Sequence, residues 1–187
     1  MQPDTMPDTA RLQPAVTTTL FRDAMSRLGA PVTIVTTSGP AGRQGLTVSA
    51  MTSVSDTPPT VLVCLNRANR SHEAFVRNGV IGISLLSQGH EDIAGTFASS
   101  TRSADEKFAM GAWHADVTGA PLLVDALATF DCTISTVHMS GSHDVMFCAV
   151  KAIHIHPAGE TGLAWFGRRF HSLPSAGDAR YDRLVGR

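Results

Sequence analysis

The sequence predicts a mainly β domain, folded as an antiparallel Greek-key β-barrel with short helices. Three observations support this prediction. Segments with strand-like patterns recur along the chain, and glycine- or proline-containing turns join several of them as hairpins. Only three short segments have helical spacing, and they do not alternate regularly with strands as in a parallel sheet. No period of about 20–50 residues recurs, which excludes a repeat protein.

Composition limits the class of protein. The 187 residues are enough for one domain with a substantial core, and a content of 43% hydrophobic and 17% charged residues is typical of a globular chain. The net charge of -1 and the lack of long basic runs argue against nucleic acid as a partner. A phosphate-bearing small molecule remains possible, because it needs only a few local cations and backbone donors.

The cysteines and the termini indicate a cytoplasmic protein. Cys64, Cys132 and Cys148 lie in apolar, strand-like segments without a C-x-x-C pair, which favours buried thiols in a reducing compartment. No apolar stretch reaches the ~20 residues that span a membrane, and no secretory signal precedes the domain. We expect residues 1–19 to form a flexible tail, residues 20–173 the domain and residues 174–187 a C-terminal extension.

The first third of the chain predicts a helix and two strands. Residues 20–28 have the spacing of a short amphipathic helix that Gly29 ends, and β-branched residues 31–37 form a strand. The glycine-rich residues 38–45 are interpreted as a hairpin loop. Their G-x-x-G-x-x-G spacing is not that of a dinucleotide fingerprint, and a strand over 46–51 follows them.

The next segments predict an anion site. A turn at 56–59 leads to a strand over 61–65, which we expect to neighbour the strand over 46–51, and then to a loop rich in amides and arginines. Hydroxyl side chains on one strand and the polar loop after the other suit a ligand with a flat polar ring and a phosphate. Residues 72–78 form a helix that Gly79 ends. Ser71 is its N-cap, and the first-turn N–H groups could hold a phosphate or could serve the helix alone.

The remaining segments are assigned on the same grounds. The expected elements are a strand over 80–87, a helix over 91–99, a surface loop over 100–105, a strand over 130–136, a turn at 140–143, a strand over 145–155 and one last strand over 162–173.

Several polar residues could carry chemistry. His154 and His156 form an H-x-H pair, but no third potential ligand lies at a sequence spacing typical of metal sites. Solvent-facing histidines are therefore favoured over a metal site. His143, near the hairpin tip, either makes local hydrogen bonds or is functional. Ser49 lies in no nucleophile motif, and Lys107 is expected to be solvated. We expect no metal.

The motifs resemble those of a known family, the short-chain NAD(P)H:flavin oxidoreductases, which are reductase components of two-component flavin monooxygenases. The motifs are TVSA at 47–50, SVSDTPP at 53–59, LVCLNR at 62–67, FA at 97–98, KF at 107–108, GSH at 141–143 and GRRF at 167–170. Their order and spacing hold over about residues 20–173. FRDAMSRLGA at 21–30 and AIHIH at 152–156 are most similar to the NADH-dependent FMN reductases of the Rut pyrimidine-degradation pathway. Reductases that serve 4-hydroxyphenylacetate monooxygenase share the same core.

The resemblance implies a split-barrel, FMN-binding Greek-key fold that forms a homodimer with flavin near the interface. It implies an NAD(P)H:flavin oxidoreductase that uses FMN or FAD with NADH or NADPH, and that supplies reduced flavin to a separate monooxygenase. The cofactors carry such chemistry, so no strong general base is needed. Two alternatives are a non-enzymatic flavin carrier or sensor, and an amine oxidase similar to pyridoxamine-phosphate oxidase. The TVSA and CLN motifs disfavour the amine oxidase.

The resemblance also implies residue roles. The flavin-binding positions would be Thr47, Val48, Ser49, Ala50, Cys64, Leu65, Asn66, Asn69, Arg70, Ser71, Phe97, Ala98 and Lys107, with Asn69–Ser71 and Lys107 on the phosphate side. His143 would be the catalytic position and would orient NADH, and Phe170 would line the same cleft. Ser142 replaces the aspartate that is common at that turn, which affects contacts to the pyridine nucleotide.

Overall fold

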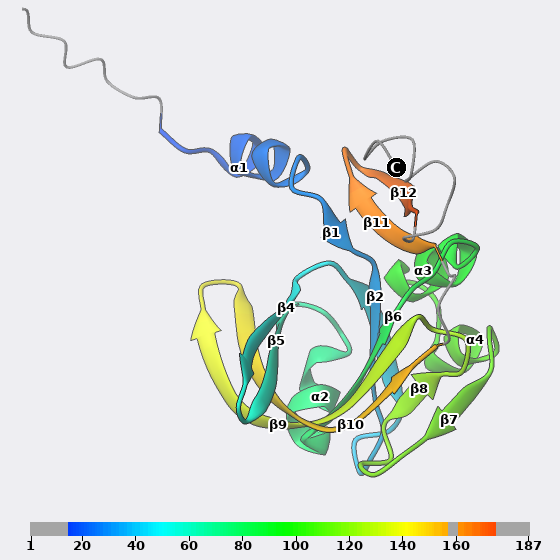
Figure 1. Cartoon of the computed structure of the whole chain (residues 1–187). Helices are drawn as coiled ribbons and strands as arrows, with labels where there is room; N and C mark the ends of the chain where they lie inside the picture. The colour runs from blue at the N-terminus through cyan, green and yellow to red at the C-terminus, as the bar shows by residue number, and fades with distance from the viewer. Residues whose placement is uncertain (1–14, 157–160, 175–187) are drawn as a thin grey trace, which may run out of the picture.

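A seven-stranded antiparallel sheet organises the molecule (Figure 1). The computed structural model describes residues 15–156 and 161–174. The strands of this sheet, in spatial order, are β3 (Gln44–Val48), β2 (Thr33–Thr37), β6 (Val80–Leu85), β9 (Ala128–Ser140), β10 (His143–Ile155), β5 (Pro59–Asn66) and β4 (Met51–Asp56). The mainly β prediction is confirmed. All but the first residue of the predicted C-terminal extension, and most of the predicted tail, lie outside the described residues.

The sheet is curved but its ladder is not closed. β3 and β4 are its two edges, and the link between them is the short segment Ser49–Ala50, where the Cys64 amide donates to the Ala50 carbonyl at 3.0 Å. The single strand predicted over 46–51 is therefore divided. The prediction that this strand neighbours the one over 61–65 is wrong for β3, which pairs with β2, and right for β4, which pairs with β5. The chain crosses from one edge to the other within two residues.

A second, three-stranded sheet lies at one end of the large one (Figure 1). It consists of β1 (Ala30–Pro31), β11 (Gly162–Phe166) and β12 (Arg169–Leu173). The prediction of one strand over 162–173 is wrong, because the chain reverses at Gly167 and Arg168. Both have positive φ, 58° and 62°, as a two-residue hairpin of type I′ requires. A small unpredicted sheet pairs β7 (Trp113–Ala115) with β8 (Pro121–Leu123).

The described residues form four helices instead of the three predicted. These are α1 (Thr18–Met25), α2 (His72–Asn78), α3 (Glu91–Ala98) and α4 (Ala104–Phe108). α2 ends as predicted at a left-handed Gly79, whereas α1 begins two residues early, inside the predicted tail, and ends before Gly29. α4 lies partly in the predicted surface loop, where Ser103 and Glu106 form a capping box. None of the helices in the described ranges is long and apolar enough to cross a membrane.

The core has two parts. One lies on the side of the large sheet that faces Phe75 of α2, and the other packs α3 against β3 and β2 and α4 against β3. Cys132 and Cys148 lie in the first part, where burial raises the pKa of both thiols to about 12. The half-buried Cys64 thiol also has a raised pKa because of desolvation, and all three cysteines are free, as predicted. These thiols are protonated at neutral pH.

Candidate functional site

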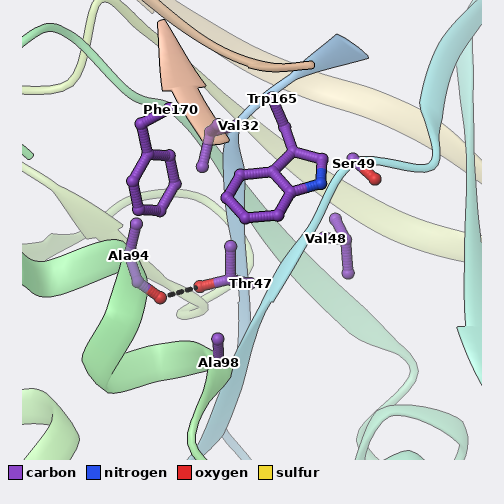
Figure 2. A pocket seen from close by; sticks show the side chains of 8 residues that line it. All are labelled: Val32, Thr47, Val48, Ser49, Ala94, Ala98, Trp165 and Phe170. Carbon is purple, nitrogen blue, oxygen red and sulfur yellow. Dashed lines mark hydrogen bonds between the residues drawn. The ribbon is translucent and has the colours of Figure 1, made fainter. Parts of the chain in front are cut away.

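An apolar pocket of about 180 Å³ opens between the two sheets. Its lining residues are Val32, Thr47, Val48, Ser49, Ala94, Ala98, Trp165 and Phe170. Figure 2 shows β3 and the end of α3 as two walls, with Trp165 and Phe170 reaching in from the β11–β12 hairpin. Small side chains on β3 and α3 leave the space that the two aromatic rings face. We call it the apolar pocket.

The two aromatic residues of this pocket are placed by the hairpin register. Trp165 and Phe170 are directly opposite each other in the β11–β12 ladder, and their ring centroids lie 5.0 Å apart in an edge-to-face arrangement. Trp165 was not singled out from the sequence. Recognition of the I′ turn at Gly167 would have paired it with Phe170, because the turn fixes the register.

The other two walls are tied together by one hydrogen bond. The Thr47 hydroxyl donates to the Ala94 carbonyl of α3 at 2.7 Å, so this donor is already used within the protein (Figure 2). The Ser49 hydroxyl has no hydrogen-bond partner among the described residues and is exposed at the rim. Of the two predicted hydroxyls, Ser49 is therefore the one available as a donor to a ligand.

A second pocket, of about 320 Å³, is polar and carries two cations. It is lined by Asn66, Ala68, Asn69, Arg70, Ser99, Ser100 and Lys107, and we call it the basic pocket. The β5–α2 loop, the residues after α3 and α4 each supply part of it. Ser99 directly follows Ala98 of the apolar pocket, so the two pockets are lined by adjacent residues at the C-terminal end of α3. Ser99 and Ser100 were not predicted, because the sequence of a polar loop does not indicate which distant residues lie next to it in the fold.

Lys107 is buried, against the expectation that it is solvated. Its side chain is 3% exposed, and Nζ donates to the carbonyls of Gly45 and Phe97 at 3.2 and 3.0 Å. Desolvation lowers the pKa of this ammonium, and the nearby Arg70 charge lowers it further. Within the described ranges no carboxylate pairs with Lys107 or Arg70. A buried cation without a counterion is costly, which indicates a place for an anion.

The two arginines of the β5–α2 loop differ in their partners. Arg67 Nε lies 3.8 Å from Asp144 Oδ1, and its Nη1 lies 2.8 Å from Met139 Sδ. Arg70 is exposed and has no such partner within the part of the chain that the structure describes. Arg70 is therefore the loop cation left for a ligand.

Some predicted flavin-binding side chains do not line either pocket. Leu65 and Phe97 are 1% and 0% exposed and belong to the core. The side chain of Leu65 points inward by strand alternation, and that of Phe97 lies on the face of α3 that packs against the sheet. Ser71 occupies the N-cap position but does not cap α2; its buried hydroxyl donates to Gln44 Oε1 at 3.1 Å. Cys64 and Ala50 meet each other through their backbones. At Leu65, Phe97 and Ser71 only backbone groups could meet a ligand, whereas Cys64 is half-buried and Ala50 is exposed.

His143 lies outside both pockets of this chain. It begins β10 at the turn after β9 and stands opposite Asn66 of the basic pocket, with Nδ1 2.9 Å from Ser142 Oγ. Figure 1 shows this turn well separated from β12, which carries Phe170. The structure therefore does not bring His143 and Phe170 into one cleft of a single chain.

The H-x-H pair makes no metal centre in this structure. His154 Nε2 lies 2.7 Å from Asp116 Oδ2, and both His154 and His156 are exposed, as favoured. The described residues contain no group of three or more potential metal ligands.

Comparison with known proteins gives one consistent family. A family model described as the flavin reductase like domain matches residues 25–174. The FMN reductase (NADH) RutF of Ancylobacter novellus is 48% identical over 160 residues, which cover 86% of this chain and 87% of that protein. A solved structure from Haemophilus somnus, provisionally assigned as a flavin reductase, is 40% identical with a TM-score of 0.82 and covers 84% of this chain and all of its own.

A further solved structure is BorF, the flavin reductase component of a bacterial two-component tryptophan halogenase. It is 28% identical with a TM-score of 0.79, over 86% of this chain and 100% of BorF.

Proposed function

The chain belongs to the flavin reductase like domain family, and on this premise we propose that it is an NADH-dependent FMN reductase. The observation that carries the proposal is the proximity of the apolar pocket and the basic pocket, which the adjacent residues Ala98 and Ser99 line at the end of α3. A flat ring and an anionic tail are the two parts of a flavin mononucleotide, and the two pockets offer an environment for each.

The residues present fit such a ligand. Lys107 and Arg70 supply two positive charges without a carboxylate among the described residues, which suits a phosphate. Thr47–Ala50, with small side chains and an available Ser49 hydroxyl, would run along the ring, and Trp165 and Phe170 would face it. Asn66 and Asn69 would contact the chain between ring and phosphate.

When both are bound, reduced nicotinamide supplies a hydride to the oxidised flavin ring. The protein's part is to hold the two flat groups in contact and to exclude water between them. The aromatic wall of Trp165 and Phe170 serves both purposes, because its two large apolar rings offer a surface for flat groups and exclude water. No nucleophile or general base is required of the chain, in keeping with the protonated, unreactive thiols.

The direct test is anaerobic mixing of NADH with excess FMN and a catalytic amount of protein. Loss of the visible flavin absorbance over many turnovers is expected. Flavin that stays oxidised, or that is reduced only in proportion to the protein present, would contradict a reductase acting on free flavin.

His143 is proposed to orient NADH, and it is not an obligatory acid. Replacing His143 by alanine should lower kcat/KM for NADH about tenfold, through a higher KM or a lower kcat, while the Kd for FMN stays within about twofold. Steady-state kinetics and flavin titration measure the two quantities. His138→Ala on the same hairpin, where His138 packs against Phe147, is the matched control. Kinetics equal to wild type would remove His143 from the account.

We infer that reduced flavin leaves for a separate monooxygenase and that the protein acts as a homodimer. Exposed rim residues such as Ser49, Ala98 and Arg70 support exchange of the flavin with solution. Exposed apolar side chains on β4 and on the β9–β10 hairpin, among them Val54, Val137 and Met139, support a second copy as the partner of that face. A dimer would also offer His143 a neighbouring copy's apolar pocket. A monomeric mass by sedimentation equilibrium would contradict the dimer.

A further inference from the structure

We propose that Asp144 is a positioning residue for the flavin phosphate: it fixes the β5–α2 loop that carries Asn69 and Arg70. This inference rests on the proposed function, because it assigns the anion in the basic pocket to a flavin. Asp144 lies in β10, outside both pockets, and is 7% exposed. Nothing in the sequence pattern distinguishes it from an ordinary strand-end carboxylate.

The contacts of Asp144 reach both ends of the loop. Its Oδ2 lies 2.8 Å from His72 Nε2 at the start of α2, and its Oδ1 lies 3.8 Å from Arg67 Nε at the end of β5. The His72 side chain is 14% exposed, so this contact is largely shielded from water. The Arg67 amide also donates to the Ser142 carbonyl at 3.0 Å, beside the same strand. The start of β10 thus holds the loop before Asn69 and after Arg70.

The loop between these two anchors is shaped by its own asparagines. Asn66 Oδ1 accepts from the Ala68 amide and Asn69 Oδ1 accepts from the Ser71 amide, both at 2.9 Å. These bonds define the local turn but do not connect it to the sheet. Asp144 ties both ends of the loop to β10, in addition to the Arg67 amide bond to Ser142 and the Ser71 hydroxyl bond to Gln44 of β3, so the position of Arg70 relative to Lys107 depends in part on that carboxylate.

Asp144 also decides where positive charge is concentrated. It pairs with Arg67 and leaves Arg70 and Lys107 as the cations of the basic pocket. Removing the carboxylate would loosen the loop, and the positive charge freed on Arg67 would offset only part of the lost phosphate contact. Both effects alter recognition of the phosphate and leave recognition of the ring unchanged. A ligand that lacks the phosphate is therefore the discriminating probe.

The experiment compares FMN with riboflavin by quenching of flavin fluorescence, so that it does not depend on turnover. Asp144→Ala should raise the Kd for FMN about tenfold and the Kd for riboflavin less than about twofold. His72→Ala should give a similar loss, and the double variant should lose less than the product of the two, because both act through one contact. Asp144→Asn, which keeps the shape, should lose less than Asp144→Ala.

The matched control is Asp116→Ala, which breaks a comparable His–Asp contact, that of His154 at 2.7 Å, away from both pockets. It should leave both Kd values as in wild type. If Asp144→Ala is too unstable for titration, the Kd values for FMN and riboflavin are measured on Asp144→Asn and His72→Ala instead. The proposal would be overturned if Asp144→Ala changed the Kd values for FMN and riboflavin by the same factor, whether that factor is large or close to one. Flavin binding with this pattern but without NADH turnover would contradict the reductase and leave the positioning role intact.

Discussion

Replacing Lys107 by methionine should raise the Kd for FMN about 30-fold. A charged hydrogen bond contributes roughly 1.5–3 kcal/mol, and Lys107 is the buried cation of the basic pocket. Methionine keeps an unbranched apolar stem and removes only the charge and its donors. The cost of the unpaired Gly45 and Phe97 carbonyls is offset by the removal of a desolvated ammonium, so the thermal midpoint should change by only a few degrees. Flavin titration and thermal unfolding measure both quantities.

The same variant should change the pH dependence of flavin binding. In the free protein the pKa of Lys107 lies below its usual value, first because of desolvation and then because of Arg70. The charged form binds the phosphate, so affinity is full below that lowered pKa and falls as the pH rises through it. This fall should begin below the usual lysine pKa of about 10.4 in wild type and be absent in Lys107→Met.

A control for charge alone is Arg43→Met. Arg43 lies over the ring of Phe108 at 4.3 Å, beside the same helix α4, but it does not line the basic pocket. It should leave the Kd for FMN within about twofold of wild type, with the pH profile retained. An equal loss in both variants would show that long-range charge, and not a local phosphate contact, sets the affinity.

Replacing Ala98 by tryptophan should abolish most activity, lowering kcat/KM for FMN by about 100-fold or more. Ala98 lines the apolar pocket at the end of α3, and the pocket volume is only about 180 Å³ (Figure 2). An indole at this position would compete with the flavin ring for the space that Trp165 and Phe170 face. Because Ala98 is exposed, the fold should tolerate the change.

The matched control for this variant is Gly95→Trp on the same helix. A Cβ at Gly95 meets nothing within 4 Å and Gly95 does not line the apolar pocket, so this variant tests the same side chain on the same helix outside the lining residues. Its activity should stay within about threefold of wild type. Full activity in Ala98→Trp, with native thermal stability, would mean that the ring binds elsewhere.

Sequence patterns predicted those helices and strands whose ends are determined by nearby residues, such as helix caps and tight turns. α2 and its left-handed stop at Gly79 follow from helix capping, and the β2–β3 and β9–β10 hairpins follow from alternating segments around tight turns. The two arginines of the β5–α2 loop and its following helix start predicted an anion site before any family was considered. The resemblance added the prediction that Thr47–Ala50 runs along a flavin ring, and this segment lines the apolar pocket up to Ser49.

What the sequence could not predict depends on tertiary contacts. Lys107 has the pattern of a solvated lysine, and only the fold covers it with β3 and α3. Ser71 has the pattern of a capping serine, yet its hydroxyl donates a hydrogen bond to Gln44 of β3. Leu65 was included because the resemblance implies flavin contacts along this strand, although strand alternation turns its side chain into the core. Asp144 and Trp165 were missed because their partners are distant in sequence.

The most direct test of the account is the rate of NADH oxidation by the purified protein, followed by nicotinamide absorbance with FMN or FAD added in turn. We predict rapid oxidation that requires added flavin, is fastest with FMN, and is faster with NADH than with NADPH. No turnover under any pairing, with FMN still bound after gel filtration, would contradict the reductase and leave a flavin carrier or sensor in its place.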